Sequence, residues 1–384
     1  MKAILFIDII IAMKKIIIMF LIWFIFINLL NPLSLKFLFD RTSYELPKNI
    51  TLNFRHIFVP WLNFDGRNYL EIATQGYNPN FRIELRVFFP LFPLLIRLLS
   101  LNLLLNPIIV GLTISFFAFL GAIFMFDELL KNDQINEKDR RKTILFMLLF
   151  PTSYYFLGFY TESIFLLLTL LIFYFLNKKN FLLASIFTAI TTATRITGLA
   201  LLPVIFHEGY NQYKKSKKFP LSIIIAPLGF VMYSLYLQLT TGNALAIILM
   251  QKNWDRPMGI FGPFIALYDG LNKFIFASPL TQGDFFGHSM EVLEFLFAVF
   301  YIFLLINSFK KVKFTYWLFM LFSAVPIFFS GALSSIQRYM VILFPIYIYL
   351  TKKTNNKYFY LICFCFLILL IYFTSLFLRG YWVA

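Results

Sequence analysis

The feature that most constrains this chain is a series of long apolar runs separated by short basic clusters. A helix needs about twenty apolar residues to cross the hydrocarbon core of a bilayer. Candidate spans occupy residues 16–38, 107–126, 143–158, 164–177, 220–239, 292–309, 314–331, 339–351 and 358–378. Only 14% of the 384 residues are charged and 60% are hydrophobic, so the chain lacks the polar surface of a water-soluble protein. The sequence therefore predicts an all-α polytopic membrane protein with a single domain over residues 1–384.

Two further apolar stretches have more than one interpretation. Residues 87–105 contain two prolines and an arginine, so they either span the bilayer or lie at its surface as a juxtamembrane helix. Residues 181–208 are interrupted near Arg195 and have basic clusters on both sides, which favours two short helices that meet at the break. With these stretches included, the sequence predicts roughly 9–12 transmembrane helices.

The formal net charge of +16 comes largely from short Lys and Arg clusters beside the apolar runs. Such clusters stay on the cytoplasmic side of a membrane and attract anionic lipid head groups. This distribution predicts contacts with membrane lipids and argues against binding to nucleic acid. The apolar run near the N-terminus lacks a small-residue cleavage site, so we expect a retained span rather than a removed signal peptide.

The predicted orientation places the basic clusters inside the cell. Residues 39–86 then form a first external loop, which we expect to carry juxtamembrane helices, and residues 240–290 form a second large external loop. The break near Arg195 and the segment before Tyr339 also fall outside. Because most of the unusual polar residues lie on one side of the membrane, the sequence predicts a single external site.

The polar segment 63–77 follows the first predicted span and contains the first candidate residue, Asp65. A carboxylate at the membrane face is suited to take a proton from an acceptor hydroxyl as a general base. Aspartate is also favoured at the N-cap of a helix, and the spacing alone leaves both roles open. Arg67 and Tyr69 lie on the same segment. Both are candidates for substrate binding, with ion pairing or solvation as the alternative for the arginine.

Three further charges stand in or beside apolar runs, where a charge is costly. Glu162 is expected either to orient a sugar hydroxyl, to pair with an arginine of the site, or to lie favourably at the start of a helix. Arg195 and Arg338 are candidates for phosphate binding, because a guanidinium group matches the geometry of a phosphate. The alternatives are an ordinary loop position for Arg195 and, for Arg338 together with Tyr339, anchoring at the membrane interface.

The second predicted external loop contributes two more candidates, Trp254 and Arg256. A tryptophan beside charge could stack on a sugar ring, although tryptophan also belongs to the aromatic belt at membrane interfaces. The histidines are too dispersed and the cysteines too few for a metal site, and no cofactor is expected. The sequence also lacks the usual motifs of nucleotide hydrolysis and proteolysis.

Three sequence blocks, in the order of the family, resemble PIG-V-type mannosyltransferases. The blocks are FDGRNYLEIATQGY at 64–77 with FFPLFP at 88–93, FPTSYYFLGFYTES at 150–163 with TRITG at 194–198, and RY at 338–339 with FP at 344–345. Together they extend over most of the chain. The members of this family add the second mannose to the glycosylphosphatidylinositol anchor precursor.

The resemblance implies a C-type (GT-C) membrane glycosyltransferase fold and a lipid-linked donor, typically dolichyl or polyprenyl phosphate mannose. It places the catalytic aspartate of the family at Asp65 and makes Glu162, Arg195 and Arg338 candidates for the site. The chain lacks the long luminal loops of eukaryotic members. We therefore expect a bacterial or archaeal relative in the plasma membrane, or in the endoplasmic reticulum membrane if the source is eukaryotic.

The expected activity is inverting transfer of a hexose, with mannose as the expected sugar, to a lipid-linked or cell-surface glycan at the external membrane face. Such a displacement needs one base for the acceptor and cations for the departing phosphate. Two alternatives stay open. A transporter or flippase of a lipid-linked saccharide would use the same arginines without a base, and a non-catalytic subunit of a glycosylation complex would neither bind nor turn over the donor.

Overall fold

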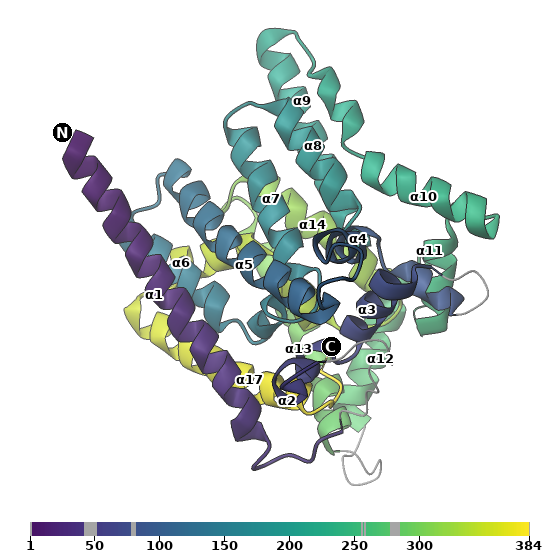
Figure 1. The fold of residues 1–384 in the computed structure, drawn as a ribbon. Coiled ribbons are helices and arrows are strands. Elements are labelled where there is room, and N and C mark those ends of the chain that lie inside the picture. Colours follow the sequence, from purple (N-terminus) through teal and green to yellow (C-terminus); the bar gives the residue numbers. More distant parts are fainter. Residues whose placement is uncertain are drawn as a thin grey trace.

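Every regular element in the part of the chain that the structure describes is helical (Figure 1). This computed structural model describes residues 2–41, 52–77, 82–254, 256, 259–276 and 285–383. The α-helices are α1 (Lys2–Ser34), α2 (Arg55–Phe58), α3 (Asp65–Gln75), α4 (Leu91–Leu99), α5 (Pro107–Asn132), α6 (Glu137–Leu149), α7 (Glu162–Asn177), α8 (Phe181–Thr192), α9 (Leu201–Ser216), α10 (Leu228–Thr241), α11 (Ala246–Leu249), α12 (Gly262–Phe276), α13 (Phe285–Ser308), α14 (Phe314–Phe328), α15 (Ile336–Val341), α16 (Phe344–Lys353) and α17 (Asn356–Leu378). Short 3-10 helices connect them: η1 (Val59–Leu62), η2 (Ile83–Val87), η3 (Ser153–Phe156), η4 (Ile196–Ala200), η5 (Leu221–Ile225) and η6 (Met250–Trp254). For these residues the predicted all-α class is confirmed.

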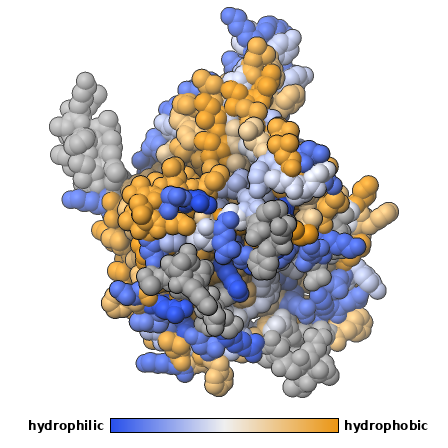
Figure 2. All heavy atoms as spheres, turned by 45° about the vertical axis from the view of Figure 1, so that its right-hand side comes forward, coloured by the Kyte–Doolittle hydropathy of each residue, from blue (hydrophilic) through white to orange (hydrophobic). Residues whose placement is uncertain are grey.

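Five segments of the described chain are long and apolar enough to cross a membrane. They are Lys14–Ser34, Pro107–Asn132, Leu221–Thr241, Ser289–Ser308 and Asn356–Leu378. Large apolar side chains on these segments are exposed, among them Phe117, Leu239 and Phe364, and Figure 2 shows hydrophobic residues gathered over broad areas of one face. Such a surface is suited to lipid rather than to water. The chain is therefore an integral membrane protein, as its composition predicts.

The other predicted spans are shorter or broken. α7, α8 and α14 are apolar but have fewer than eighteen residues. Residues 143–158 divide into α6 and η3, because Pro151 disfavours helical geometry at the preceding Phe150, whose ψ is 136°. Residues 339–351 likewise divide into α15 and α16 just before Pro345. The helical membrane class is thus supported, whereas the count of roughly 9–12 spans stays a prediction.

The breaks are covered by other parts of the protein. Between α6 and α7, Tyr154, Tyr155 and Tyr160 are fully buried. Their rings pack around Phe377 of α17 at centroid distances of 5.0, 5.2 and 5.9 Å. Irregular backbone is tolerated at membrane depth only where protein or a water-filled cavity adjoins it. The breaks therefore create a protein-lined interior in which η3, α7 and α17 meet.

Helix length settles the two ambiguous stretches. α4 has nine residues, about 14 Å at 1.5 Å per residue, and is too short to cross a bilayer. Residues 181–208 form α8 and part of α9, which meet through η4 next to Arg195, as the sequence predicts. The predicted external loops contain α2, η1, α3 and η2 in residues 39–86, and α11, η6 and α12 in residues 240–290. Parts of both loops (42–51, 78–81, 255, 257–258 and 277–284) lie outside the described residues.

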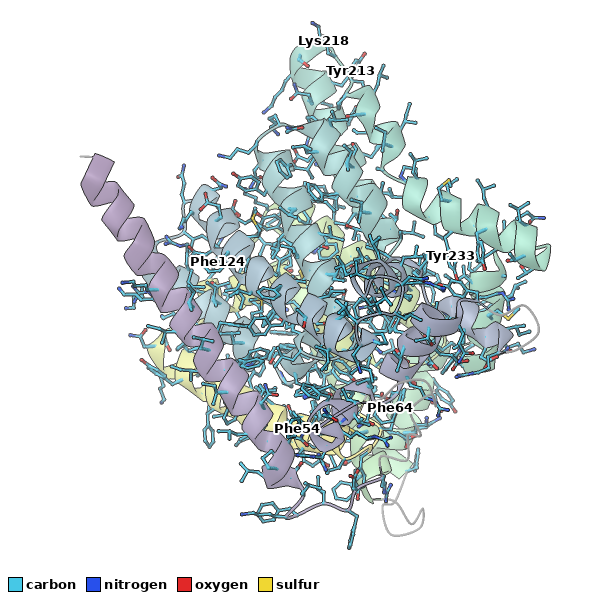
Figure 3. The ribbon with its side chains drawn as sticks, viewed as in Figure 1. Phe54, Phe64, Phe124, Tyr213, Lys218 and Tyr233 are labelled. Carbon is cyan, nitrogen blue, oxygen red and sulfur yellow. The ribbon has the colours of Figure 1, made fainter. Side chains whose placement is uncertain are left out.

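The segment that begins α3 lies away from one of the basic clusters. In Figure 3, Lys218, which follows α9, is at the top of the view, and Phe64, which precedes α3, is in the lower half. The C-terminal end of α17 lies near the same end of the bundle as the C-terminal end of α1, where the backbone N–H of Arg41 donates to the carbonyl of Arg379 at 2.9 Å. The orientation of these ends relative to the membrane stays a prediction.

Candidate active site

Asp65 is the first residue of α3, and two hydrogen bonds at Asn63 fix the backbone that precedes it. The Asn63 side-chain amide donates to the carbonyl of Phe377 at 2.6 Å, and the Tyr160 hydroxyl donates to the carbonyl of Asn63. Phe64 adopts a φ of 59°, which costs free energy in a residue other than glycine, so these contacts hold a strained backbone in place. The helix-cap alternative for Asp65 is wrong, because Phe64 occupies the N-cap position.

The Asp65 carboxylate begins a chain of ion pairs that ends at Arg195. Arg338 Nη1 donates to Asp65 Oδ2 at 2.5 Å, and Arg338 Nε donates to Glu162 Oε1 at 2.6 Å. Arg195 Nη1 donates to the same Glu162 oxygen at 2.9 Å. Two carboxylates therefore face two guanidinium groups, and their formal charges cancel. These four residues, which we call the cavity cluster, are distant in sequence, and the breaks in the helices bring them together.

Glu162 is the innermost member of the cavity cluster. Its side chain is fully buried, and it is the first residue of α7, where a carboxylate is favoured by the helix dipole. Two of the interpretations of Glu162 from the sequence therefore agree with its surroundings. It lies at the start of a helix, and it pairs with arginines of the site. It does not line the cavity described below. From this position Glu162 orients two arginines, and it has no direct contact with the space where a substrate would lie.

Arg195 enters the site from the break between α8 and α9. Its guanidinium lies over the rings of Tyr339 and Phe165, with its central carbon 5.0 and 5.7 Å from their centroids. Gly198, three residues later, allows the backbone of η4 to approach α8 closely. A Cβ at that position would lie only 2.6 Å from the carbonyl oxygen of Thr191. The glycine of the TRITG block therefore helps to set the direction from which Arg195 reaches the site.

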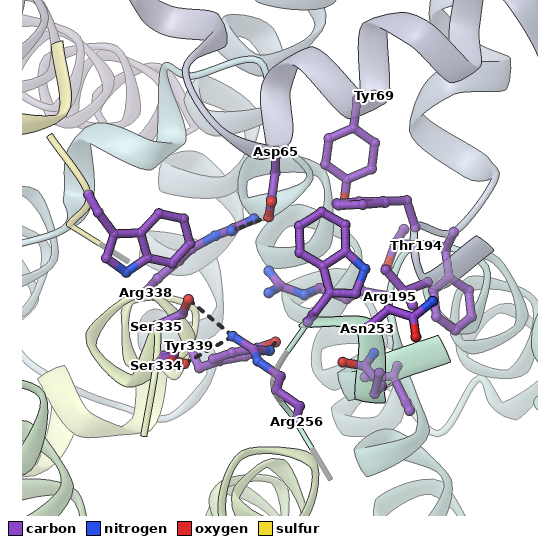
Figure 4. A pocket seen from close by; sticks show the side chains of 17 residues that line it. Asp65, Tyr69, Thr194, Arg195, Asn253, Arg256, Ser334, Ser335, Arg338 and Tyr339 are labelled. Carbon is purple, nitrogen blue, oxygen red and sulfur yellow. Dashed lines mark hydrogen bonds and ion pairs between the residues drawn. The ribbon is translucent and has the colours of Figure 1, made fainter. Parts of the chain in front are cut away.

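A cavity of about 440 Å³ opens beside the cavity cluster. The predicted site residues that line it are Asp65, Tyr69, Arg195, Trp254, Arg256, Arg338 and Tyr339. Figure 4 shows Asp65 and Tyr69 entering from α3 at the top of the view and Arg256 lying at the bottom. The polar walls thus come from segments far apart in the chain: α3, the break before η4, the end of η6 with the residues after it, and α15.

Arg256 differs from the other two arginines of the cavity in its partners. Its guanidinium donates to the Tyr339 hydroxyl at 3.1 Å, the Ser334 carbonyl at 3.1 Å and the Ser335 hydroxyl at 3.3 Å, all neutral oxygens. Within the described ranges it forms no ion pair with a carboxylate. Glu294 of α13 is buried behind this wall, where it accepts a hydrogen bond from the backbone N–H of Ser335 at 3.0 Å. Among the described residues, Arg256 therefore presents a positive charge that no directly bonded carboxylate cancels.

Two aromatic residues, Tyr69 and Trp254, also line the cavity. The Tyr69 ring meets Phe88 and Phe92 at centroid distances of 5.1 and 5.5 Å. Burial raises the pKa of the Tyr69 hydroxyl well above its ordinary value, so this group stays protonated and can donate a hydrogen bond to a ligand. The Trp254 indole N–H donates to the carbonyl of Glu84 at 3.4 Å, which holds its ring against η2 at the cavity wall.

Arg67 is the predicted site residue that the structure places elsewhere. It is exposed on α3 and is not among the residues that line the cavity. The reason is the helical period: residues two apart point in different directions, whereas Asp65 and Tyr69, four apart, share a face. We therefore do not include Arg67 in the proposed site.

Several lining residues carry no signal in the sequence. Ser334, Ser335, Asn253 and Trp382 line the cavity, yet as uncharged residues they do not stand out beside the apolar runs. Glu294, which is buried behind the cavity wall, does carry a signal in the sequence. A carboxylate within the apolar run 292–309 is costly, and this cost could have identified it.

Within the described residues, no three or more His, Cys, Asp or Glu side chains form a group that could hold a metal ion. The cavity instead offers a carboxylate, three guanidinium groups, hydroxyl donors and aromatic faces. No family model, no curated protein and no solved structure matches this chain.

Proposed function

We propose that the protein is an inverting GT-C-type glycosyltransferase. It would move a hexose, with mannose the first candidate, from a polyprenyl- or dolichyl-phosphate donor to a lipid-linked or cell-surface glycan. The observation that carries this proposal is that Asp65 and three arginines, Arg195, Arg256 and Arg338, line one cavity. The three blocks that resemble PIG-V-type enzymes support the same activity. The proposed setting is a multi-pass protein whose cavity opens at the external face of a bacterial or archaeal plasma membrane.

The proposed reaction is a single displacement at the anomeric carbon of the donor sugar. Asp65 takes the proton of the acceptor hydroxyl as the acceptor oxygen forms its bond to that carbon. The bond between the anomeric carbon and the phosphate oxygen breaks, and the electron pair leaves with the lipid phosphate. Positive groups that are already in place stabilise the charge that develops on this phosphate. Attack from the opposite side inverts the configuration of the sugar.

The balance of charge supports Arg256 as the first candidate to bind the phosphate. The charges of Arg195 and Arg338 are matched by Glu162 and Asp65 at 2.5–2.9 Å, so an anion near them would compete with carboxylates that are already bound. Arg256 is bonded only to neutral oxygens of the described residues. A phosphate there would gain charge-assisted hydrogen bonds without displacing a carboxylate. Arg195 and Arg338, which both pair with Glu162, then contribute positive charge near the phosphate without binding it first.

The experiment that tests the function uses purified protein in liposomes with a panel of labelled polyprenyl-phosphate sugars and glycolipid acceptors. A glycosyltransferase produces a labelled acceptor and free polyprenyl phosphate in equal amounts. A transporter moves the intact labelled lipid between leaflets and forms no new glycosidic bond. A non-catalytic subunit gives neither result. Product formation with at least one donor of the panel is expected, and movement of the intact lipid without any product would contradict the proposal.

A further inference from the structure

Residues 379–383, which we call the 379–383 segment, follow α17 and are fixed by contacts with distant parts of the chain. Gly380, with a φ of 75°, turns the backbone where the helix ends, a conformation that glycine adopts at low cost. The Arg379 side chain is almost completely buried. It donates to the carboxamide oxygen of Asn31 and pairs with Asp40 at 3.6 Å, so the segment is anchored to the end of α1.

Both neighbours of Trp382 are buried as well. The Arg41 guanidinium lies over the Tyr381 ring, with its central carbon 4.1 Å from the centroid. On the other side, the Gln337 side-chain amide of α15 donates to the carbonyl of Val383. The backbone before and after Trp382 is therefore fixed, and so is the place from which its indole ring extends.

Trp382 itself is 46% exposed, and it lines the cavity together with Asp65. Its ring meets that of Phe64 edge to face, with centroids 5.0 Å apart and an interplanar angle of 88°. Because Phe64 immediately precedes Asp65, this contact places the indole on the side of the cavity where the proposed base lies. A large apolar ring is thus held at the wall of a polar cavity while almost half of its surface stays open.

We propose that Trp382 is the stacking platform for the ring of the acceptor sugar. This inference rests on the proposed function, because the acceptor is the substrate whose hydroxyl gives its proton to Asp65. A sugar ring has a face of C–H groups that packs on the flat surface of an indole, while its hydroxyls remain free for hydrogen bonds. The donor phosphate belongs with Arg256, which lies opposite Asp65 in Figure 4. The two substrates therefore depend on different side chains.

The test compares Trp382→Ala and Trp382→Phe with Trp317→Phe in the purified full chain, with octyl α-mannoside below its micellar concentration as the acceptor probe. Trp317 of α14 bonds to the Leu305 carbonyl at 2.8 Å and does not line the cavity, so it is the matched control. Trp382→Ala should weaken binding of the probe about tenfold, as expected for loss of an aromatic contact. Trp382→Phe should retain most of the affinity, and the KM for the lipid-phosphate donor should change less than about twofold in both variants.

A binding measurement separates this inference from the proposed function. Binding of radiolabelled octyl α-mannoside in equilibrium dialysis requires no turnover, and it should be weakened about tenfold in Trp382→Ala but retained in Trp382→Phe and Trp317→Phe. Wild-type affinity of Trp382→Ala for the probe would overturn the platform, even if the protein transfers sugar. Equal weakening of probe and donor would overturn it too, because Trp382 would then only support the cavity wall.

Discussion

Two groups of paired charges in this molecule have similar chemistry but different surroundings. The cavity cluster joins Asp65, Arg338, Glu162 and Arg195 at 2.5–2.9 Å. A second group, which we call the Asp127 cluster, joins Asp127 to Arg140 at 2.8 Å and to Lys131 at 2.9 Å. The Asp127 side chain is buried, and its pair with Arg140 ties α5 to α6, whereas its pair with Lys131 lies within α5. None of its three members lines the cavity beside Asp65.

The difference teaches that paired charge alone does not mark a functional site. Buried ion pairs pay a desolvation penalty and contribute little net stability, so each group needs a reason to persist. For the Asp127 cluster the connection of two helices is a sufficient reason. The cavity cluster adds open space and a neighbouring arginine, Arg256, that is bonded only to neutral oxygens among the described residues. The proposed place for an anion and a reacting hydroxyl rests on this combination.

The largest effect on stability is expected from Glu162→Gln. This change removes the carboxylate shared by Arg195 and Arg338 and leaves two buried cations with one counter-charge. Loss of one partner in a buried pair costs about 3–5 kcal/mol, and unfolding in detergent should show a decrease of this size. A decrease below about 1 kcal/mol would mean that the two arginines do not depend on Glu162.

A smaller effect, confined to the donor, is expected from Arg256→Gln. Hydrogen bonds to a charged group are worth about 1.5–3 kcal/mol, so the KM for a polyprenyl-phosphate donor should rise about 10- to 100-fold. The matched control is Lys252→Gln, which removes an exposed basic residue of η6 that does not line the cavity. If both variants raise the KM equally, the phosphate responds to the general charge of the loop and not to Arg256.

Gly198→Ala should disturb the cavity cluster indirectly, by displacing the backbone of η4. The added methyl group would meet the Thr191 carbonyl oxygen at 2.6 Å, and overpacking of this kind costs about 1–3 kcal/mol. Because η4 must move away from α8, Arg195 should lose its alignment with Glu162, and transfer activity should fall together with stability. Gly242→Ala lies where a Cβ has open space but φ is 72°, so it controls for backbone strain alone. Equal loss of activity in both variants would contradict a specific role for the close approach.

The smallest effect is expected from Glu137→Gln at the start of α6. Glu137 is half exposed and pairs with Arg141 and, at 3.8 Å, with Lys15. Exposed pairs contribute about 0–1 kcal/mol, so stability and activity should both stay close to wild type. This variant makes the same chemical change as Glu162→Gln. A large loss in Glu137→Gln would therefore remove the distinction between exposed pairs and the cavity cluster.

The parts of the site that could be predicted are those that are costly in an apolar chain. Asp65, Glu162, Arg195 and Arg338 stand out because a charge beside the bilayer needs a partner, and the structure brings all four together. The sequence could not show which charge pairs with which, because the pairs join residues up to 273 positions apart. The charge balance that singles out Arg256 is visible only once these pairs are known.

The fold was predictable as a class and at the break near Arg195, but not at its other breaks. Apolar runs identify the long helices, yet a run such as 143–158 does not show that Pro151 divides it and that tyrosines then fill the interior. The position of Trp382 at the cavity could not be predicted from the sequence, for a similar reason. Its place at the cavity depends on the anchoring of Arg379 and Tyr381, which are contacts between distant segments and leave no local pattern.

The measurement that tests the central claim most directly is the rate of sugar transfer by Asp65→Asn, with Asp127→Asn as the matched control. Both variants remove one charge from a paired aspartate, but only Asp65 lines the cavity. A general base contributes about 10²- to 10⁴-fold, so transfer by folded Asp65→Asn should fall by that factor while donor binding remains, and Asp127→Asn should transfer at a near wild-type rate. Folded Asp65→Asn protein that transfers sugar as fast as the wild type would contradict the account.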